Sequence, residues 1–336
     1  MKIFTILSDI GSWLWAALRW VLRSLLEGLR ITLEFMADSA SPPSPYTGTF
    51  MSPNDKRAML CKRHKGFALG ANAHHRLSLM DSYRNIICYG ASGSGKSSAL
   101  IMPSMLQLEH SAVVFDIGNA LYQETSGYLA SKGFAIRRMD LDDASQSETF
   151  NPLLRCNSVS QLKQLSHTLI ETALPSSKSS DPYWNSSADQ LLFVLLRILK
   201  ECCPPPLQTL ANLRHWLNHL SADLKSAGFQ WIARHATDAL FQEAKALLTG
   251  SAEKSVDSTL MTLRVALEKV ADPTIAALTS SDSLGDFHRL LRDEKTVLYI
   301  GVKEATLGYN SFLLSLLLND LFAALLKCLP LMLQKV

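Results

Sequence analysis

Short apolar runs alternate with helical patterns along the chain from residue 85 onward. Four of these runs have the length and composition of buried strands, and they lie at 86–89, 112–115, 134–139 and 296–302. Helical segments lie between them, as in a mostly parallel sheet that is covered by helices on both faces. The pattern therefore predicts an α/β fold with a mostly parallel sheet.

Strand patterns disappear between about residues 157 and 290. Two strongly apolar stretches in this interval, 191–196 and 260–267, fit the helical period, and three prolines at 204–206 break the first helical series. We therefore expect an all-α domain at 157–290, inserted into the α/β domain.

The α/β domain is thus predicted in two pieces, 54–156 and 291–336. Within the second piece, the apolar run 312–333 is long enough to suggest a transmembrane helix. Asn319, Asp320 and Lys327 lie inside the run and argue against a membrane span. We expect a core helix of the α/β domain, exposed on one side where the sheet is incomplete.

The first 36 residues predict a separate amphipathic or membrane-associated helix. Its longest strongly apolar run without charge, 10–18, is far shorter than the ~20 residues of a spanning helix. The segment could lie in a membrane interface or pack on a protein surface. Residues 37–53 follow as a linker rich in serine and proline. The charged residues of the helix fall on one stripe: Arg19, Arg23, Glu27, Arg30 and Glu34.

Composition limits the classes of protein that fit this pattern. Of the 336 residues, 47% are hydrophobic and 19% are charged, which excludes a disordered chain. The net charge of +3 excludes a histone-like polycation but leaves room for a local basic patch. The six cysteines form no CxxC pair, so neither a structural zinc site nor a disulfide framework is expected. His215 and His219 lie four residues apart like metal ligands, but a solvated helix surface is the favoured interpretation.

The most specific motif follows the first apolar run. It matches G-x-x-x-x-G-K-[ST] in full and reads Gly90-Ala91-Ser92-Gly93-Ser94-Gly95-Lys96-Ser97-Ser98. An apolar strand before it and a helical segment after it argue against a chance loop of glycines and serines. The motif predicts a P-loop nucleotide-binding domain.

Each residue type in this loop has a chemical task. Glycines at 90, 93 and 95 let backbone N–H groups turn inward around a phosphate, and the following helix adds the positive end of its dipole. Lys96 would reach the β- and γ-phosphates, the Ser97 hydroxyl would ligate Mg²⁺, and Ser98 lies near the α-phosphate. ATP and Mg²⁺ are the expected ligands. Pro103 is expected to kink or end the helix after about two turns.

Several further short sequence motifs precede or follow the loop in a characteristic order. With them, residues 48–326 resemble the type IV coupling proteins, the TraG/TraD-type ATPases of conjugation and type IV secretion. These motifs are Ile101-Met102-Pro103-Ser104-Met105-Leu106, the strand that ends in Asp116, Phe150-Asn151-Pro152-Leu153, Asp181-Pro182-Tyr183-Trp184, and the stretch from Ser255 to Ser280.

The resemblance implies a RecA-like P-loop NTPase that acts as a hexameric motor at the cytoplasmic face of the inner membrane. Such a motor uses ATP to recruit DNA, DNA–protein complexes or effector proteins and to move them into a type IV secretion channel. The all-α domain of the family engages substrates or accessory proteins.

Three departures from the family pattern matter for the predicted activity. Asp116 is followed by Ile117-Gly118-Asn119-Ala120 where the family has Lys-Gly-Glu. One helix with a charged stripe replaces the paired transmembrane helices. No apolar strand ending in Asp-Glu follows the helix at 309–326, so the sequence looks truncated before the Walker B strand and the catalytic residues stay unassigned.

These departures leave alternatives open. Asp116 could hold Mg²⁺ through water, but a helix cap is the favoured interpretation, and the missing half could come from another polypeptide. The favoured function is an ATP-binding coupling protein. The alternative is a non-hydrolysing nucleotide-binding adaptor or a truncated remnant of such a motor. The Asn-Pro-Leu and Asp-Pro-Tyr-Trp motifs fit a third possibility, an FtsK-like DNA translocase, less well.

Overall fold

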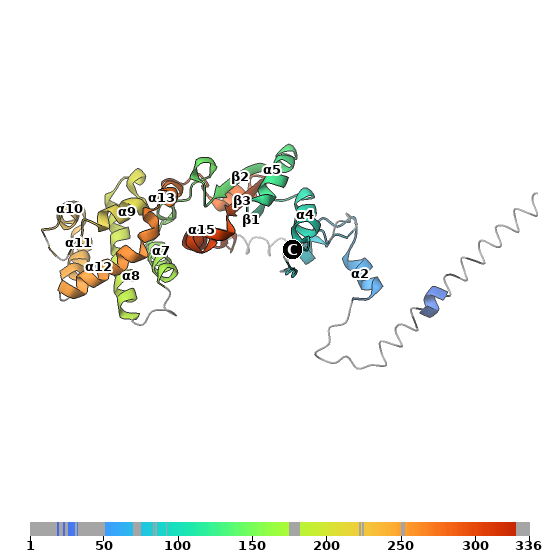
Figure 1. Ribbon diagram of the computed structural model, residues 1–336, viewed down its shortest axis with the longest axis horizontal. Helices are drawn as coiled ribbons and strands as arrows, with labels where there is room; N and C mark the ends of the chain where they lie inside the picture. The colour runs from blue at the N-terminus through green and yellow to red at the C-terminus, as the bar shows by residue number, and fades with distance from the viewer. Residues whose placement is uncertain are drawn as a thin grey trace, which may run out of the picture. The chain divides into compact units, whose positions relative to one another are not determined.

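The computed structural model describes most of the chain from residue 51 to residue 326 (Figure 1). The described residues are 19, 23, 26–30, 32, 51–69, 75–82, 84, 86–91, 93–174, 182–221, 223, 225–249 and 253–326. They belong to two compact units, 1–59 and 60–336.

The first unit contains the predicted N-terminal helix and linker. The residues described between 19 and 32 are helical and exposed, and the Thr32 hydroxyl donates a hydrogen bond to the Gly28 carbonyl at 3.0 Å. The rest of the predicted helix and residues 37–50 of the predicted linker lie outside the described residues. Helix α2 (Pro53–Met59) follows, and none of its residues is buried.

The second unit is built on a three-stranded parallel sheet. Its strands are β1 (Ala112–Ile117), β2 (Ala135–Asp140) and β3 (Thr296–Val302), in the order β1-β3-β2. All seven residues of β3 are buried, because this strand has a neighbour on each side and helices on both faces. The predicted α/β class with a parallel sheet is confirmed.

Alternate residues of β3 face two different hydrophobic clusters, as the two-residue period of a strand requires. Val297 and Tyr299 pack with Met105 of α4 (Met102–Leu106) and with Leu121 and Leu129 of α5 (Ala120–Ser131). The residues between them, Leu298, Ile300 and Val302, belong to the larger cluster, which includes residues of α14 (Phe287–Arg292) and α15 (Leu307–Leu326).

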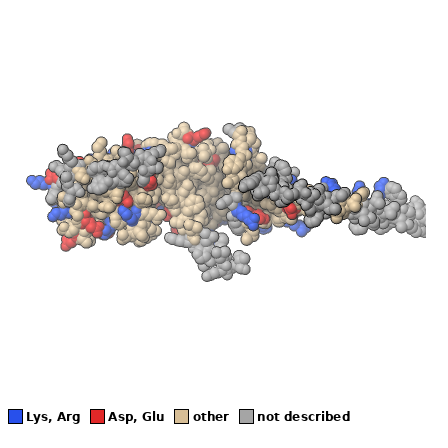
Figure 2. Space-filling model, turned by 90° about the horizontal axis from the view of Figure 1, so that it is seen from below, with Lys and Arg blue, Asp and Glu red and all other residues tan. Residues whose placement is uncertain are grey.

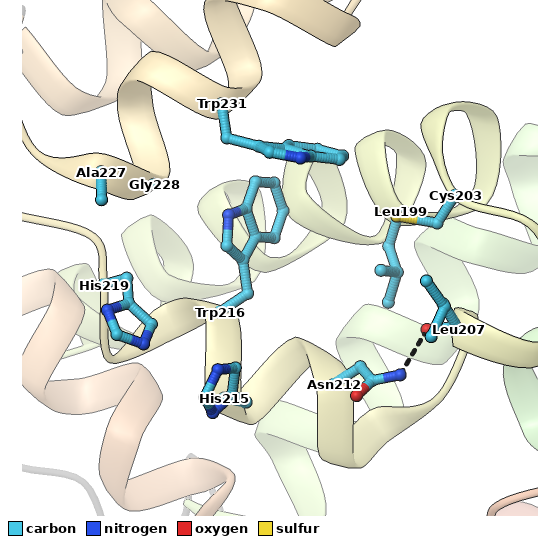
Figure 3. Close-up of a pocket in the computed structure, with 10 residues that line it drawn as sticks. All are labelled: Leu199, Cys203, Leu207, Asn212, His215, Trp216, His219, Ala227, Gly228 and Trp231. Atoms are coloured by element: carbon cyan, nitrogen blue, oxygen red, sulfur yellow. Dashed lines mark hydrogen bonds between the residues drawn. The ribbon is translucent and has the colours of Figure 1, made fainter.

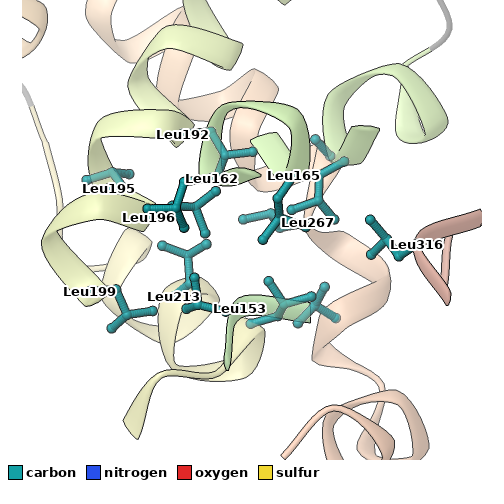
Figure 4. Packing of buried hydrophobic residues seen from close by; sticks show 14 of the residues in the cluster. Leu153, Leu162, Leu165, Leu192, Leu195, Leu196, Leu199, Leu213, Leu267 and Leu316 are labelled. Atoms are coloured by element: carbon teal, nitrogen blue, oxygen red, sulfur yellow. The ribbon is translucent and has the colours of Figure 1, made fainter. Parts of the chain in front are cut away.

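No strand lies between β2 and β3 among the described residues, and the chain there is helical. Helix α8 is the centre of this region and contributes fully buried leucines to its core (Figure 4). The helical insertion is therefore observed, whereas the domain boundaries at 157 and 290 stay a prediction. The helices are α6 (Pro152–Arg155), α7 (Val159–Ala173), α8 (Pro182–Cys202), α9 (Leu210–Leu217), α10 (Ala227–His235), α11 (Asp238–Thr249), α12 (Glu253–Ala266) and α13 (Pro273–Leu278).

The prediction of a buried strand at 86–89 is wrong for this structure. Residues 86–91 lie outside any ladder, and Ile87 and Tyr89 are 71% and 89% exposed. A strand is stabilised by its neighbours, and the outer edge of β1 has no ladder partner among the described residues. A four-residue apolar run without such a neighbour has no sheet to join.

Helix α15 agrees with the expectation of a core helix that is exposed on one side. Phe312, Leu313 and Leu317 are buried, whereas Phe322 and Leu326 are 57% and 61% exposed. The segment Glu304–Leu326 is the one described stretch long and apolar enough to cross a membrane, and a third of its apolar window is buried inside the protein. The packing against the sheet and α7 favours a core helix.

Candidate functional site

The phosphate loop turns at two glycines with left-handed backbones. Gly93 and Gly95 have φ angles of 76° and 80°, which residues with a side chain rarely adopt. The Ser94 N–H donates to the Ala91 carbonyl at 3.2 Å and closes the turn. A Cβ on Gly90 would lie 2.7 Å from Ser94 Oγ, so a larger residue there would displace the Ser94 side chain. Ser92 lies outside the described residues.

Lys96 folds back over the loop. Its Nζ donates hydrogen bonds to the Gly90 and Ala91 carbonyl oxygens, both at 2.7 Å. The ammonium group is therefore held against the loop by two neutral acceptors, which a phosphate oxygen would outcompete as a charged acceptor. The Ser98 hydroxyl donates to the Gly95 carbonyl at 3.2 Å.

The helix after the loop does not end at Pro103 but continues to Leu106. A π-helical segment, Ser97–Ile101, runs directly into α4, in which Pro103 occupies the first turn, and α4 ends at Leu106. Pro103 has no N–H to donate to the preceding turn, which agrees with a local change of helical pitch at this point.

A short hairpin that the sequence did not reveal secures this helix. Ala68 and Arg76 form an antiparallel bridge, and the Ala68 N–H donates to Ser104 Oγ at 2.9 Å. Arg76 donates to the Gln107 carbonyl at the end of α4 at 3.5 Å. These bonds fix the helix that carries Lys96 and Ser97, although neither strand-like half of the hairpin is apolar enough to be recognised.

Asp116 lies at the carboxyl end of β1 and is 2% exposed. Its Oδ2 accepts a hydrogen bond from the Tyr122 N–H at 2.8 Å, in the first turn of α5. Gly118 and Asn119, both with positive φ, make the tight turn between them. The carboxylate thus satisfies a free N–H at a helix start, as a cap does. Its role as a Mg²⁺ ligand stays a prediction.

Two further carboxylates at the same edge of the sheet were not predicted. Asp140 accepts from Asn119 Nδ2 at 3.2 Å and pairs with Arg138. Asp142 accepts from the Lys303 N–H at 2.6 Å. Protein donors thus occupy both carboxylates, and the described residues contain no group of three or more His, Cys, Asp or Glu placed to hold a metal. The sequence signal that could have revealed Asp140 and Asp142 is their position at the end of the apolar run that forms β2.

The outer edge of β1 is open and apolar. Phe115 and Ile117 are 41% and 49% exposed on the face of the sheet that α15 covers elsewhere. In the space-filling view, few charged side chains lie in the middle of the face that is shown (Figure 2). An exposed strand edge with apolar side chains is able to pair with a further strand.

The sequence matches the family model for conjugative DNA transfer by the type IV secretory system over residues 53–332. The chain belongs to this type IV conjugative coupling family. No curated protein matches the sequence.

Solved structures of the bacterial conjugative coupling protein TrwB share the fold of this chain. The first of them is of TrwB without its 70 N-terminal residues. The trigonal sulphate complex has a TM-score of 0.54 at 16% identity and covers 85% of this chain. The complex with the ATP analogue ADPNP has a TM-score of 0.53 at 16% identity and covers 84% of it. The chain spans 63% and 62% of the lengths of these two TrwB chains. The P-loop NTPase-like fold is thereby confirmed.

Proposed function

We propose that this chain is an ATP-binding coupling protein of a conjugative or type IV secretion system that recruits DNA or effector proteins and helps to translocate them. The observation that carries the proposal is the phosphate loop, in which the Gly90 and Ala91 carbonyl oxygens hold the Lys96 ammonium group. Family membership and the fold shared with TrwB, which has been solved with non-hydrolysable ATP and GTP analogues, support it.

The residues of the loop fit a nucleoside triphosphate with its metal ion. Backbone N–H groups of residues 90–98 and the start of the helix would hold the phosphates, and the Lys96 ammonium would move from the loop carbonyls to phosphate oxygens. Ser97 is the first residue of the helix, and its hydroxyl would supply one ligand to Mg²⁺. When bound, Mg²⁺ neutralises part of the phosphate charge. Asp116, buried and bonded to α5, would act on Mg²⁺ only through water.

A second candidate function is a nucleotide-binding adaptor that does not hydrolyse ATP. The observation that favours it is the engagement of Asp116 with the Tyr122 N–H, since hydrolysis requires a carboxylate that is free to hold Mg²⁺ and orient water. The open edge of β1 offers a place for a strand that would bring such a carboxylate, from this polypeptide or another.

Release of phosphate from ATP, with and without DNA, separates the two functions. The motor proposal predicts turnover that DNA stimulates and that Lys96→Ala abolishes. The matched control Lys132→Ala changes an exposed lysine on the same domain and is expected to have no effect. Nucleotide binding without turnover would exclude a motor made of this chain alone and would establish the adaptor.

We further propose that the chain acts as a hexamer with type IV secretion components at the cytoplasmic face of the inner membrane. The support is the family together with the charged stripe of the N-terminal helix. Deleting residues 1–36 is expected to move the protein from the membrane fraction to the soluble fraction on cell fractionation. An unchanged distribution would show that this segment does not anchor the chain.

A further inference from the structure

The helical insertion has a pocket of about 470 Å³, in which Trp216 of α9 and Trp231 of α10 pack edge to face (Figure 3). The volume would suit a nucleotide. The described side chains that line the pocket include no Lys or Arg, which are the usual side-chain partners of a triphosphate. Under the proposed function, nucleotide affinity therefore depends on the phosphate loop and on the residues that hold it in place.

The helix that follows the phosphate loop begins with a π-helical turn. The turn is Ser97–Ile101, and the Met102 N–H donates to the Ser97 carbonyl five residues earlier. Pro103 accounts for this wide turn, because in a regular α-helix its ring would clash with the carbonyl four residues earlier. Such turns are frequent at functional sites. The turn also decides how Lys96 and Ser97 are presented at the start of the helix.

The hydroxyl group of Ser104 connects this turn to the hairpin that contains Ala68. It donates to the carbonyl of Leu100, within the turn, at 2.8 Å, and the Ala68 carbonyl lies 3.3 Å away as a second acceptor. The same oxygen accepts the Ala68 N–H at 2.9 Å. Ala68 is only 1% exposed, so water competes little for these bonds. One side chain thus joins the backbones of two elements.

The hairpin is a firm support for this connection. The Gly66 N–H donates to the Leu77 carbonyl at 3.0 Å, and the Leu77 N–H donates to the Phe67 carbonyl at 2.9 Å. The Phe67 N–H donates to Ser82 Oγ at 2.8 Å, which ties the hairpin to α3 (Leu79–Ser82). Ser104 is therefore bonded to a braced segment and not to a loose loop.

Packing contributes little to holding the π-helical turn. None of its residues is buried, and Ser97, Ser98 and Ala99 are exposed. A segment that buries little surface opens at a low cost in free energy. The hydrogen bonds of Ser104 are therefore a large share of what keeps the turn in one conformation.

We propose that Ser104 is a positioning residue of the nucleotide site, which keeps Lys96 and Ser97 in place by fixing the π-helical turn to the hairpin. The inference rests on the proposed function, because it assigns a support to the same phosphate loop. Without the hydroxyl group, the turn would populate further conformations. The apparent affinity for ATP then falls in proportion to the fraction of molecules that is competent to bind.

Two variants of the same shape test the hydroxyl group. Ser104→Thr keeps it, and Ser104→Val replaces it with a methyl group. In titrations of the full chain with a fluorescent ATP analogue and Mg²⁺, we expect Ser104→Val to bind roughly three- to tenfold more weakly than Ser104→Thr, as loss of one hydrogen bond implies. Equal affinities of the two variants would overturn the proposal.

A buried hydroxyl group elsewhere separates positioning from general destabilisation. Ser166 of α7 is fully buried and donates to the Asp189 carbonyl at 2.8 Å. Ser166→Ala should lower the midpoint of thermal unfolding and leave the affinity for the analogue unchanged, whereas Ser104→Ala should lower the affinity. Equal losses of affinity in these two variants would show that Ser104 acts only through overall stability, and would refute its positioning role.

Hydrogen exchange of the nucleotide-free chain keeps this inference distinct from the proposed function. The amides of residues 97–106 should exchange faster in Ser104→Val than in Ser104→Thr, whereas those of α7 should not differ. A chain that binds the analogue equally well in both variants retains the proposed function and loses this inference. A chain that binds no analogue, but whose exchange at 97–106 depends on the hydroxyl group, retains the support by Ser104 and loses the proposed function.

Discussion

One glycine in the central strand makes room for the turn that follows β1. A Cβ on Gly301 would lie 2.0 Å from Asn119 Oδ1, and Asn119 in turn donates to Asp140. Gly301→Ala is therefore expected to destabilise the protein by about 1–3 kcal/mol, because the side chain of Asn119 is held between two strands and has to move. Urea-induced unfolding followed by circular dichroism measures this loss.

The matched control for this change is Gly127→Ala. Gly127 lies within α5, and a Cβ there would meet nothing within 4 Å. Alanine in the middle of an exposed helix is more favourable than glycine by about 0.5–1 kcal/mol, so this variant should be slightly more stable than the parent protein. Equal effects of the two substitutions would contradict the close approach between Gly301 and Asn119.

A buried thiol links stability to alkaline pH. Burial raises the pKa of Cys156 from 9.0 to about 11, so the folded protein holds the thiol proton more tightly than the unfolded chain. The resulting stabilisation, roughly 2–3 kcal/mol, is fully present below pH 9 and is lost as the pH rises toward 11. Between pH 9 and pH 11, the free energy of unfolding of Cys156→Ala should therefore fall less than that of the parent protein, as measured by urea titrations.

The other alkaline groups do not obscure this comparison. Burial also raises the pKa of Cys202, Cys203 and Tyr299, and these groups are common to both proteins. The difference between the two slopes therefore reports Cys156 together with its effect on the pKa of the neighbouring Lys200. Identical slopes would show that the thiol is more accessible to water than the structure indicates.

At the scale of elements, one arginine joins segments that are far apart in the sequence. Arg155, at the end of α6, binds Asp282 through Nε and Nη2 at 3.0–3.1 Å and Asp320 of α15 at 2.6 Å. Its guanidinium also lies 4.1 Å from the ring centroid of Phe287 in α14. The Arg155 side chain is only 12% exposed and that of Asp282 17%, so the ion pair between them is shielded from water.

Arg155→Met should therefore cost about 3–5 kcal/mol, because Asp282 would be left without its partner. Burial already raises the pKa of Asp282, and Arg155 acts against that shift. Adding Asp282→Asn to Arg155→Met should recover part of the loss in chemical unfolding. Lys65→Met, which removes an exposed ion pair with Glu109, should leave stability nearly unchanged. If Arg155→Met destabilised the protein no more than Lys65→Met, the role of Arg155 as a link between these elements would be contradicted.

The elements that the sequence predicted well are those stabilised by their own pattern. Strand β3 was predicted at its observed bounds, because a long apolar run between polar ends suits a central strand. Residues 86–89 carry a similar run but are exposed, since strand formation there depends on a neighbour that no local pattern encodes. The phosphate loop was predictable because spacing alone defines it. The helix cap formed by Asp116 was the favoured interpretation, whereas the partners of Asp140 and Asp142 were not predictable, because tertiary contacts decide them.

At the scale of the whole molecule, the chain combines a phosphate loop beside a parallel sheet with a helical insertion that has a pocket of its own. The fold and the family account for the parallel sheet, the phosphate loop and the insertion between β2 and β3. Under the proposed function, the open edge of β1 and the capped Asp116 separate nucleotide binding from hydrolysis, because binding needs the loop and hydrolysis needs an additional carboxylate.

The central claim is that the loop around Lys96 binds ATP, and titration of the full chain with a fluorescent ATP analogue and Mg²⁺ tests it most directly. We predict saturable binding that unlabelled ATP displaces and that Lys96→Ala weakens by roughly 10- to 100-fold, as loss of a charged hydrogen bond to phosphate implies. Absence of saturable binding by the folded chain, or binding of equal strength in Lys96→Ala, would contradict the account.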